Sequence, residues 1–146
     1  MFQSILVPID GSEHSRVALC VACKLARQED GRIVLLHIPE ALPHEPLLVW
    51  GAGAVPLGAT LEKREQVGRE LLDHAIEEAK ALGVEQVTPV LTEGDPSQAI
   101  LAAADEHGIE TIVMGSRGLG DLKGLVVGSV SHKVSHSAEC RVITVR

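Results

Sequence analysis

Short apolar runs alternate with longer amphipathic segments along most of this chain. The apolar runs are rich in Val, Ile and Leu and have the length of buried strands: residues 5–9, 33–38, 87–91, 109–114 and 142–145. Between them, apolar residues recur three or four positions apart, which predicts helices over residues 13–28, 62–82, 96–107 and from Ser129 onward. This alternation indicates an α/β fold with a doubly wound parallel sheet and helices on both faces, formed by one domain, residues 1–146.

Residues that start and stop helices mark several boundaries. Ser12 is a candidate N-cap for the first helix, and Val17, Val21 or Ala22, and Leu25 are expected to face the core. The third helix has a stronger start signal, because a capping Asp, a Pro at the first helical position and a Gln that would complete a capping box follow in order at residues 95–98.

Residues 39–61 break the periodic pattern. They contain four prolines and three glycines, and we interpret them as one long connection. Trp50 lies within this connection, and its segment fits a lid over a ligand, a dimer contact or a tolerated insertion. The sequence does not choose among the three.

A glycine-rich segment follows the fourth apolar run. Gly115 and Gly118 open it, and Gly128, Ser129 and Ser131 close it at the start of the last predicted helix. Glycine allows a backbone to approach a ligand closely, and a helix N-terminus presents N–H groups and the positive end of its dipole to an anion. The order strand, glycine segment, helix start therefore predicts a phosphate-binding loop. The alternative is a flexible surface loop beside a cationic edge strand.

The distribution of charge favours the phosphate interpretation. Residues 1–114 contain 8 basic and 18 acidic side chains, whereas residues 115–146 contain 5 and 2. Arg117, Lys123 and Lys133 place positive charge around the glycines of a chain whose net charge is −7, which suits a small polyanion at that place.

Better-known phosphate motifs do not match. A P-loop requires Gly-Lys followed by Ser or Thr, but here Lys123 precedes Gly124. A dinucleotide fingerprint requires G-x-G-x-x-G in the first turn, but that turn reads Asp10-Gly11-Ser12. It also lacks the Ser-Gly-Gly run of pyrophosphatase-type ATP loops.

Composition excludes several partners. Aromatic residues are 1% of the chain, which disfavours base stacking on single-stranded nucleic acid, and a pI near 5.4 disfavours duplex nucleic acid and anionic membranes. No apolar run approaches the length of a bilayer span, and no signal peptide is recognisable. With an odd number of cysteines, three, we expect a soluble cytoplasmic protein.

These residues together resemble a known family. The pattern G-x₂-G-x₉-G-S at residues 115–129, the N-terminal Ile-Leu-Val-Pro-Ile-Asp-Gly-Ser and the second-strand Leu-Leu-His-Ile resemble the ATP-binding branch of the universal stress protein family, over essentially the whole chain. The resemblance implies a Rossmann-like five-stranded sheet with strand order 3-2-1-4-5 and a homodimer joined through the last strand.

The resemblance also implies a site. Pro8 and Asp10 would flank the nucleoside, with Asp10 bonding ribose or holding Mg²⁺ through water, and Ile38 would pack on adenine. Met114 and Gly115 would close around the base and ribose. The residues lining the phosphates would be Arg117, Gly118, Gly128, Ser129, Val130 and Ser131. Two departures concern affinity: Arg141 stands where relatives usually have proline, and Asp121 stands where they usually have a small neutral residue.

Other chemistry-bearing residues favour structural roles. Cys20 and Cys23 form a C-x-x-C pattern beyond the first turn of a helix, where a redox pair would not be activated, so packing is favoured. His132, His136 and Cys140 have a spacing that would suit zinc, but a fourth ligand is not evident. His37, like His107, is interpreted as an ordinary polar residue at the boundary of an element.

The function that these patterns favour is an ATP-binding regulatory module acting in stress response. Nucleotide occupancy would bias dimer geometry or the choice of an unidentified protein partner, and the letters do not separate ATP from ADP or AMP. No general base is evident for hydrolysis, so no catalytic residue is assigned. A slow Mg²⁺-dependent ATP hydrolase and a nucleotide-free dimeric scaffold remain alternatives. A phosphoacceptor domain would need an acidic partner beside Asp10, an acceptor Asp after the third strand and a late Lys, and it is disfavoured because residues 92–95 supply only a capping Asp.

Overall fold

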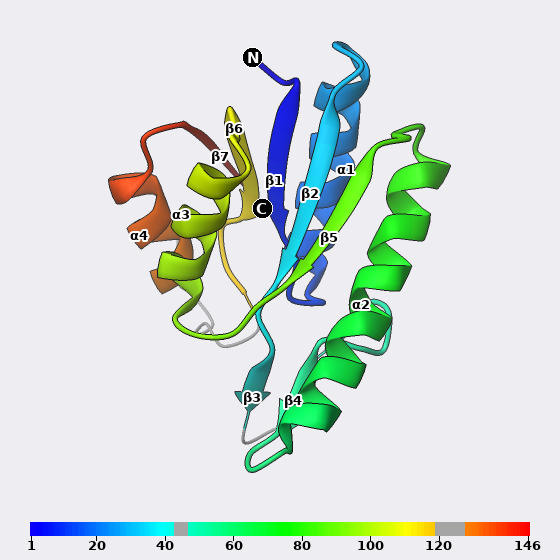
Figure 1. The fold of residues 1–146 in the computed structure, drawn as a ribbon, viewed down its shortest axis with the longest axis vertical. Helices are drawn as coiled ribbons and strands as arrows, with labels where there is room; N and C mark the ends of the chain where they lie inside the picture. Colours follow the sequence, from blue (N-terminus) through cyan, green and yellow to red (C-terminus); the bar gives the residue numbers. More distant parts are fainter. Residues whose placement is uncertain (43–46, 119–127) are drawn as a thin grey trace.

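A five-stranded parallel sheet forms the centre of the molecule. The computed structural model describes residues 1–42, 47–118 and 128–146. The strands of the main sheet are β1 (Ser4–Pro8), β2 (Arg32–His37), β5 (Val87–Leu91), β6 (Thr111–Gly115) and β7 (Arg141–Val145). Their order is β5-β2-β1-β6-β7, with every neighbouring pair parallel (Figure 1). The predicted doubly wound sheet with order 3-2-1-4-5 is confirmed.

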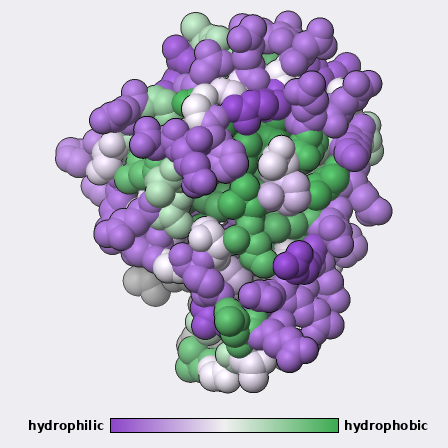
Figure 2. Space-filling view, in the orientation of Figure 1, coloured by the Kyte–Doolittle hydropathy of each residue, from purple (hydrophilic) through white to green (hydrophobic). Residues whose placement is uncertain are grey.

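Two helices cover each face of this sheet. In the described residues the helices are α1 (Glu13–Arg27), α2 (Leu61–Ala81), α3 (Pro96–Glu106) and α4 (Ser129–Ser137). Alternate residues of the central strands face opposite sides, so Ile5 and Val7 pack with α1 and α2, whereas Leu6 packs with α3 and α4. Figure 2 shows apolar side chains gathered over the middle of one face, with hydrophilic residues around them.

The buried face of α1 differs from the expected one. The side chains that α1 buries against the sheet are mostly small: Ser15, Ala18, Leu19, Ala22, Cys23 and Ala26. Of the expected inward positions, Ala22 is buried, and Val21 and Leu25 are partly buried and pack against the core. Val17 is partly buried and is not among the residues packed against the core, so the expected face is confirmed only in part. Small side chains allow the helix to approach the sheet closely, and the helix carries apolar residues on more than one side, which leaves its periodicity ambiguous. Burial raises the pKa of the Cys23 thiol to about 12, in agreement with a packing role.

The segment interpreted as one irregular connection contains two strands. β3 (Glu40–Leu42) and β4 (Ala54–Pro56) pair in parallel as a separate two-stranded sheet. Part of the intervening chain packs on the turn after β1: the Val49 N–H donates to the Gly11 carbonyl at 3.0 Å, and Ala52 is buried. A Cβ on Gly11 would lie 2.5 Å from the Ala52 carbonyl oxygen, which explains the glycine there. Trp50 packs, partly buried, against the hydrophobic core.

Within the described ranges no helix is long and apolar enough to cross a membrane.

Candidate functional site

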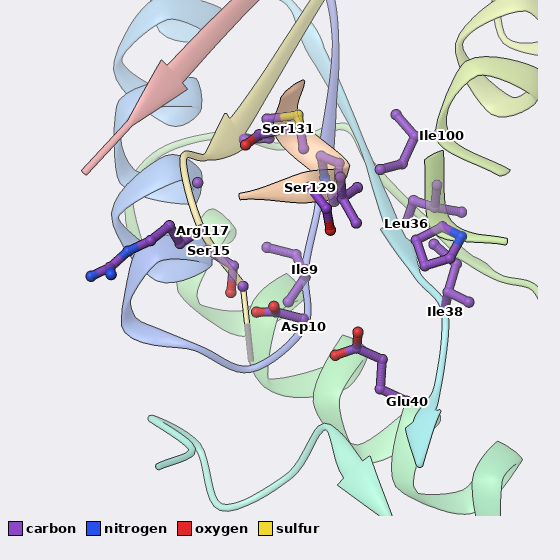
Figure 3. Close-up of a pocket in the computed structure, with 16 residues that line it drawn as sticks. Ile9, Asp10, Ser15, Leu36, Ile38, Glu40, Ile100, Arg117, Ser129 and Ser131 are labelled. Carbon is purple, nitrogen blue, oxygen red and sulfur yellow. The ribbon is translucent and has the colours of Figure 1, made fainter. Parts of the chain in front are cut away.

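A pocket opens where the winding of the sheet reverses, at the carboxyl ends of β1 and β6. β1 pairs with β2 on one side and with β6 on the other, so the loops that follow β1 and β6 diverge toward opposite faces. The pocket is lined by the ends of these strands and by turns of the helices next to them (Figure 3): Pro8, Ile9, Asp10, Ser15, Leu36, Ile38, Glu40, Pro96, Ile100, Met114, Gly115, Arg117, Gly118, Ser129, Val130 and Ser131.

The structure brings most of the predicted site residues together. All of them except Gly128 belong to this lining, although they come from four separate parts of the chain. Contact of these residues with a nucleotide stays a prediction. Asp121 and Lys123 lie outside the described residues.

Gly128 and Ser131 fasten the start of α4 to the end of β6. The Gly128 N–H donates to the Ser116 carbonyl at 2.5 Å, and the Ser131 hydroxyl donates to the same carbonyl at 2.7 Å. The Ser116 N–H donates to the Val145 carbonyl at 2.7 Å, so this buried serine also reaches β7. Ser116 was missed from the sequence because it occupies a variable position of the glycine pattern.

The first turn of α4 supplies N–H groups to one end of the pocket. Gly128 is the N-cap and has no side chain, and within the described part of the chain no side-chain cap bond is formed there. Backbone N–H groups in the first turn of a helix have no acceptor within the helix, and those of Val130 and Ser131 occupy such positions. Arg117 is half-buried, and Figure 3 shows its side chain extending away from Asp10 and Ser129. In this arrangement the backbone of α4, more than the guanidinium, faces the pocket.

An apolar wall forms another part of the pocket. Leu36 and Ile38 come from β2 and the residue after it, Ile100 and Pro96 come from α3, and Met114 comes from β6. Leu36, Ile38 and Glu40 were recoverable as a set, because alternate residues of an extended chain face the same side and Ile38 was already predicted. Ile100 lines the pocket only because α3 packs beside β6, which local sequence does not reveal.

Asp10 and Glu40 contribute carboxylates to the lining. The Asp10 Oδ1 accepts the Ser12 N–H at 2.9 Å, which orders the turn after β1, and Figure 3 shows both carboxylates on the side of the pocket opposite Ser131. Mg²⁺ takes oxygen ligands and usually retains several waters. Among the described residues no group of three or more His, Cys, Asp or Glu could hold a metal. Binding of Mg²⁺ through Asp10 stays a prediction.

The remaining candidates of the sequence lie elsewhere. His132 and His136 are exposed on α4 with stacked rings 6.4 Å apart, whereas Cys140 lies beyond the end of that helix. Arg141 is the first residue of β7, where its N–H donates to the Glu110 carbonyl at 3.3 Å. The interpretation of His37 as an ordinary polar residue is wrong. His37 does end β2, but its side chain is fully buried, with Nδ1 2.7 Å from the Ile9 carbonyl oxygen.

Comparison with known proteins decides the family. The model of the universal stress protein family matches residues 1–146. The chain belongs to the universal stress protein family. It is 38% identical to the universal stress protein YxiE of Bacillus subtilis and 37% identical to a universal stress protein of Thermus aquaticus, covering 100% of both chains in each comparison.

Solved universal stress proteins share the fold. The UspA structure from Lactobacillus plantarum matches with a TM-score of 0.77 at 20% identity, over 99% of this chain and 98% of the other. A universal stress protein in complex with cAMP matches with a TM-score of 0.72 at 23% identity, over 99% and 96% of the two chains. One from Archaeoglobus fulgidus in complex with dAMP matches with a TM-score of 0.71 at 23% identity, over 99% and 98%.

Proposed function

We propose that this universal stress protein binds an adenine nucleotide, ATP in the first place, in the pocket at the ends of β1 and β6. The base would lie against the apolar wall of Leu36, Ile38 and Ile100, and the phosphates would meet the first turn of α4. The observation that carries this proposal is the combination of an apolar wall and an uncapped helix N-terminus in one pocket, which suits a ligand with a flat apolar part and an anionic part.

The solved relatives support an adenine ligand. Two proteins of the same fold are described as complexes with cAMP and with dAMP, and both ligands carry adenine and phosphate. We expect the 5′-triphosphate to bind more tightly here than a monophosphate, because additional phosphate oxygens can accept hydrogen bonds from the N–H groups of α4. Mg²⁺ would accompany the phosphates, and ADP and AMP would bind more weakly.

The proposed role is regulatory. β7 lies at the edge of the main sheet, and its end is tied to the glycine loop through Ser116, so occupancy of the pocket has a direct route to a homodimer formed through β7. Nucleotide would then bias dimer geometry or the binding of a protein partner, provided that it binds the two states with different affinity. All three cysteines are free thiols, which suits a reducing compartment such as the cytoplasm.

Calorimetric titration tests the proposal. Purified protein is titrated with ATP, ADP, AMP and cAMP, each with and without Mg²⁺, and any copurified ligand is identified by mass spectrometry. The matched variants are Gly118→Val, which adds bulk to the pocket lining, and Ala102→Val, which places the same side chain at an exposed position of α3. We expect Gly118→Val to weaken ATP binding at least tenfold, about 1.4 kcal/mol, and Ala102→Val to leave it unchanged.

The outcomes separate the three functions considered. Heat on titration with ATP that Gly118→Val abolishes supports the nucleotide module, provided that circular dichroism shows equal helix content. Sustained release of phosphate from ATP and Mg²⁺, lost in Asp10→Ala, would favour the hydrolase instead. Absence of both copurified nucleotide and binding heat would contradict the proposal and favour the scaffold.

A further inference from the structure

His37 is the last residue of β2 and lies inside the protein with no exposed surface. Its Nδ1 is 2.7 Å from the Ile9 carbonyl oxygen. A carbonyl oxygen can only accept, so Nδ1 carries the proton and donates. In the neutral ring Nε2 then has no hydrogen, and among the described residues it has no hydrogen-bond partner. Burial lowers the pKa of His37, which favours this neutral form.

The imidazole ring of His37 packs near Gly68 of α2 and Leu91 of β5. Gly68 lies within α2, where glycine destabilises a helix relative to alanine. A Cβ at this position would lie 3.2 Å from His37 Cδ2 and 2.6 Å from Leu91 Cδ1. Glycine at this position of α2 therefore makes room first for the Leu91 side chain and also for the imidazole. The nearest charges belong to Asp10 and Glu93, and Glu93 is paired with Arg64 of α2 at 2.8 Å.

The bond from His37 joins two strand ends that carry the pocket. Ile9 lies between Pro8 and Asp10, and His37 lies between Leu36 and Ile38, so the bonded pair is flanked by four lining residues. The Ile9 N–H donates to the Leu36 carbonyl at 2.8 Å, and the His37 carbonyl accepts the Thr92 N–H at 3.1 Å. Both of these are backbone hydrogen bonds. The bond from His37 Nδ1 to the Ile9 carbonyl is the third hydrogen bond between these segments, and it alone of the three depends on the identity of a side chain.

We propose that His37 is a positioning residue of the nucleotide pocket, which holds the Ile9 carbonyl through Nδ1–H and so fixes Pro8 and Asp10 of the β1 end against Leu36 and Ile38 of the β2 end. The expected effect on ligand affinity rests on the proposed nucleotide function, whereas the hydrogen bond from His37 to the Ile9 carbonyl does not. His37 does not itself line the pocket, so its effect on a ligand passes through the backbone of residues 8–10.

The test compares two substitutions. His37→Leu removes the donor and introduces an apolar side chain of similar size, whereas His37→Asn retains an N–H donor at the δ position. His74→Leu, at an exposed position of α2, is the control. Hydrogen exchange over residues 8–12 is measured without ligand, and ATP affinity is measured by calorimetry. We expect His37→Leu to speed exchange and to weaken ATP binding about tenfold, because a buried carbonyl loses its partner. His37→Asn should stay within about threefold of the wild type in affinity.

Each outcome decides the inference. Exchange over residues 8–12 that is the same in His37→Leu and the wild type would overturn it, as would equal effects of Leu and Asn. If the wild type bound no adenine nucleotide, the proposed function would be contradicted. The hydrogen-exchange comparison, which uses no ligand, would still test whether His37 orders residues 8–12. Should His37→Leu not fold, nitrogen-15 NMR of the wild-type ring replaces it: a protonated Nδ1 with an unprotonated Nε2 is expected, and the opposite tautomer would refute the bond.

Discussion

The N-terminus of α4 differs from those of the other three helices in the described chain. Ser12 caps α1, Thr60 caps α2 and Asp95 caps α3, with side-chain oxygens that accept backbone N–H groups at 3.2, 3.1 and 3.0 Å. α4 begins instead at Gly128, which offers no side chain. A cap from Ser, Thr or Asp satisfies one of the N–H groups that a helix start leaves unpaired.

The presence or absence of a side-chain cap separates helix starts that stabilise the fold from the one that faces the pocket. The starts of α1, α2 and α3 are satisfied within the protein and stabilise the fold. The start of α4 faces the pocket with its N–H groups and the positive end of its dipole, and a bound anion could take the place of the missing cap. In the proposed function, glycine at residue 128 leaves N–H groups of the first turn for the ligand.

Installing a cap on α4 should have the largest effect on binding. In Gly128→Asp the carboxylate would accept the N–H groups intended for phosphate and repel the ligand, so we expect ATP affinity to fall about a hundredfold. Gly128→Asn caps a helix comparably but is neutral, and about a tenfold loss is expected from competition alone. Calorimetric titration measures both.

Thermal unfolding accompanies this comparison. Both Gly128 variants should unfold within a few tenths of a kcal/mol of the wild type, the usual difference between Gly and a capping residue. Tight ATP binding by folded Gly128→Asp would contradict the assignment of α4 as the phosphate site.

Removing a cap elsewhere should affect stability alone. Thr60→Ala leaves the Lys63 N–H without its side-chain acceptor, and we expect the free energy of unfolding to fall by about 1 kcal/mol, measured by urea denaturation. Because Thr60 does not line the pocket, ATP affinity should not change. Thr60→Ser, which keeps the hydroxyl, is the control. A change in ATP affinity with Thr60→Ala would show that the two classes of helix start are not independent.

The smallest effect concerns pH. Hydrogen bonds from the Ser97 hydroxyl and the Gln98 N–H lower the pKa of Asp95 below its usual value of 3.8. A lowered pKa means that the stabilisation is complete above the unfolded-state value and is lost as pH falls through the folded-state value. We therefore expect the wild type to exceed Asp95→Asn in melting temperature at neutral pH and to lose this advantage below about pH 4. A constant difference across that range would show that the charge of Asp95 contributes nothing to the cap.

Local signals explain why the elements were predictable and some contacts were not. The start of α3 followed from Asp95 and Pro96 because a cap and the helix it starts are neighbours in sequence. The capping box that Gln98 would complete stays a prediction, since only the Asp95 half of it is described. The inward face of α1 was predicted only in part, because most of its fully buried positions carry small residues that allow close approach to the sheet.

β3 and β4 show the limit of local reasoning more sharply. Each strand is three residues long and is flanked by turn-forming residues, so the sequence has no periodic pattern that would predict it. They exist because two segments some fourteen residues apart meet and pair, and because Val49 and Ala52, which lie between them, pack on the turn after β1. In the pocket, Ile100 was missed for the same reason.

The sequence by itself determined the alternation of strands and helices, the caps, the glycine pattern and the family, because these depend on residues close together in the chain. The tertiary structure alone decided that Ser116 ties β6, β7 and α4 together and that the Arg117 side chain extends away from Asp10 and Ser129. It also decided that His37 lies buried against the Ile9 carbonyl. Burial and hydrogen bonding between distant segments are properties of packing, and packing exists only once the sheet has been assembled.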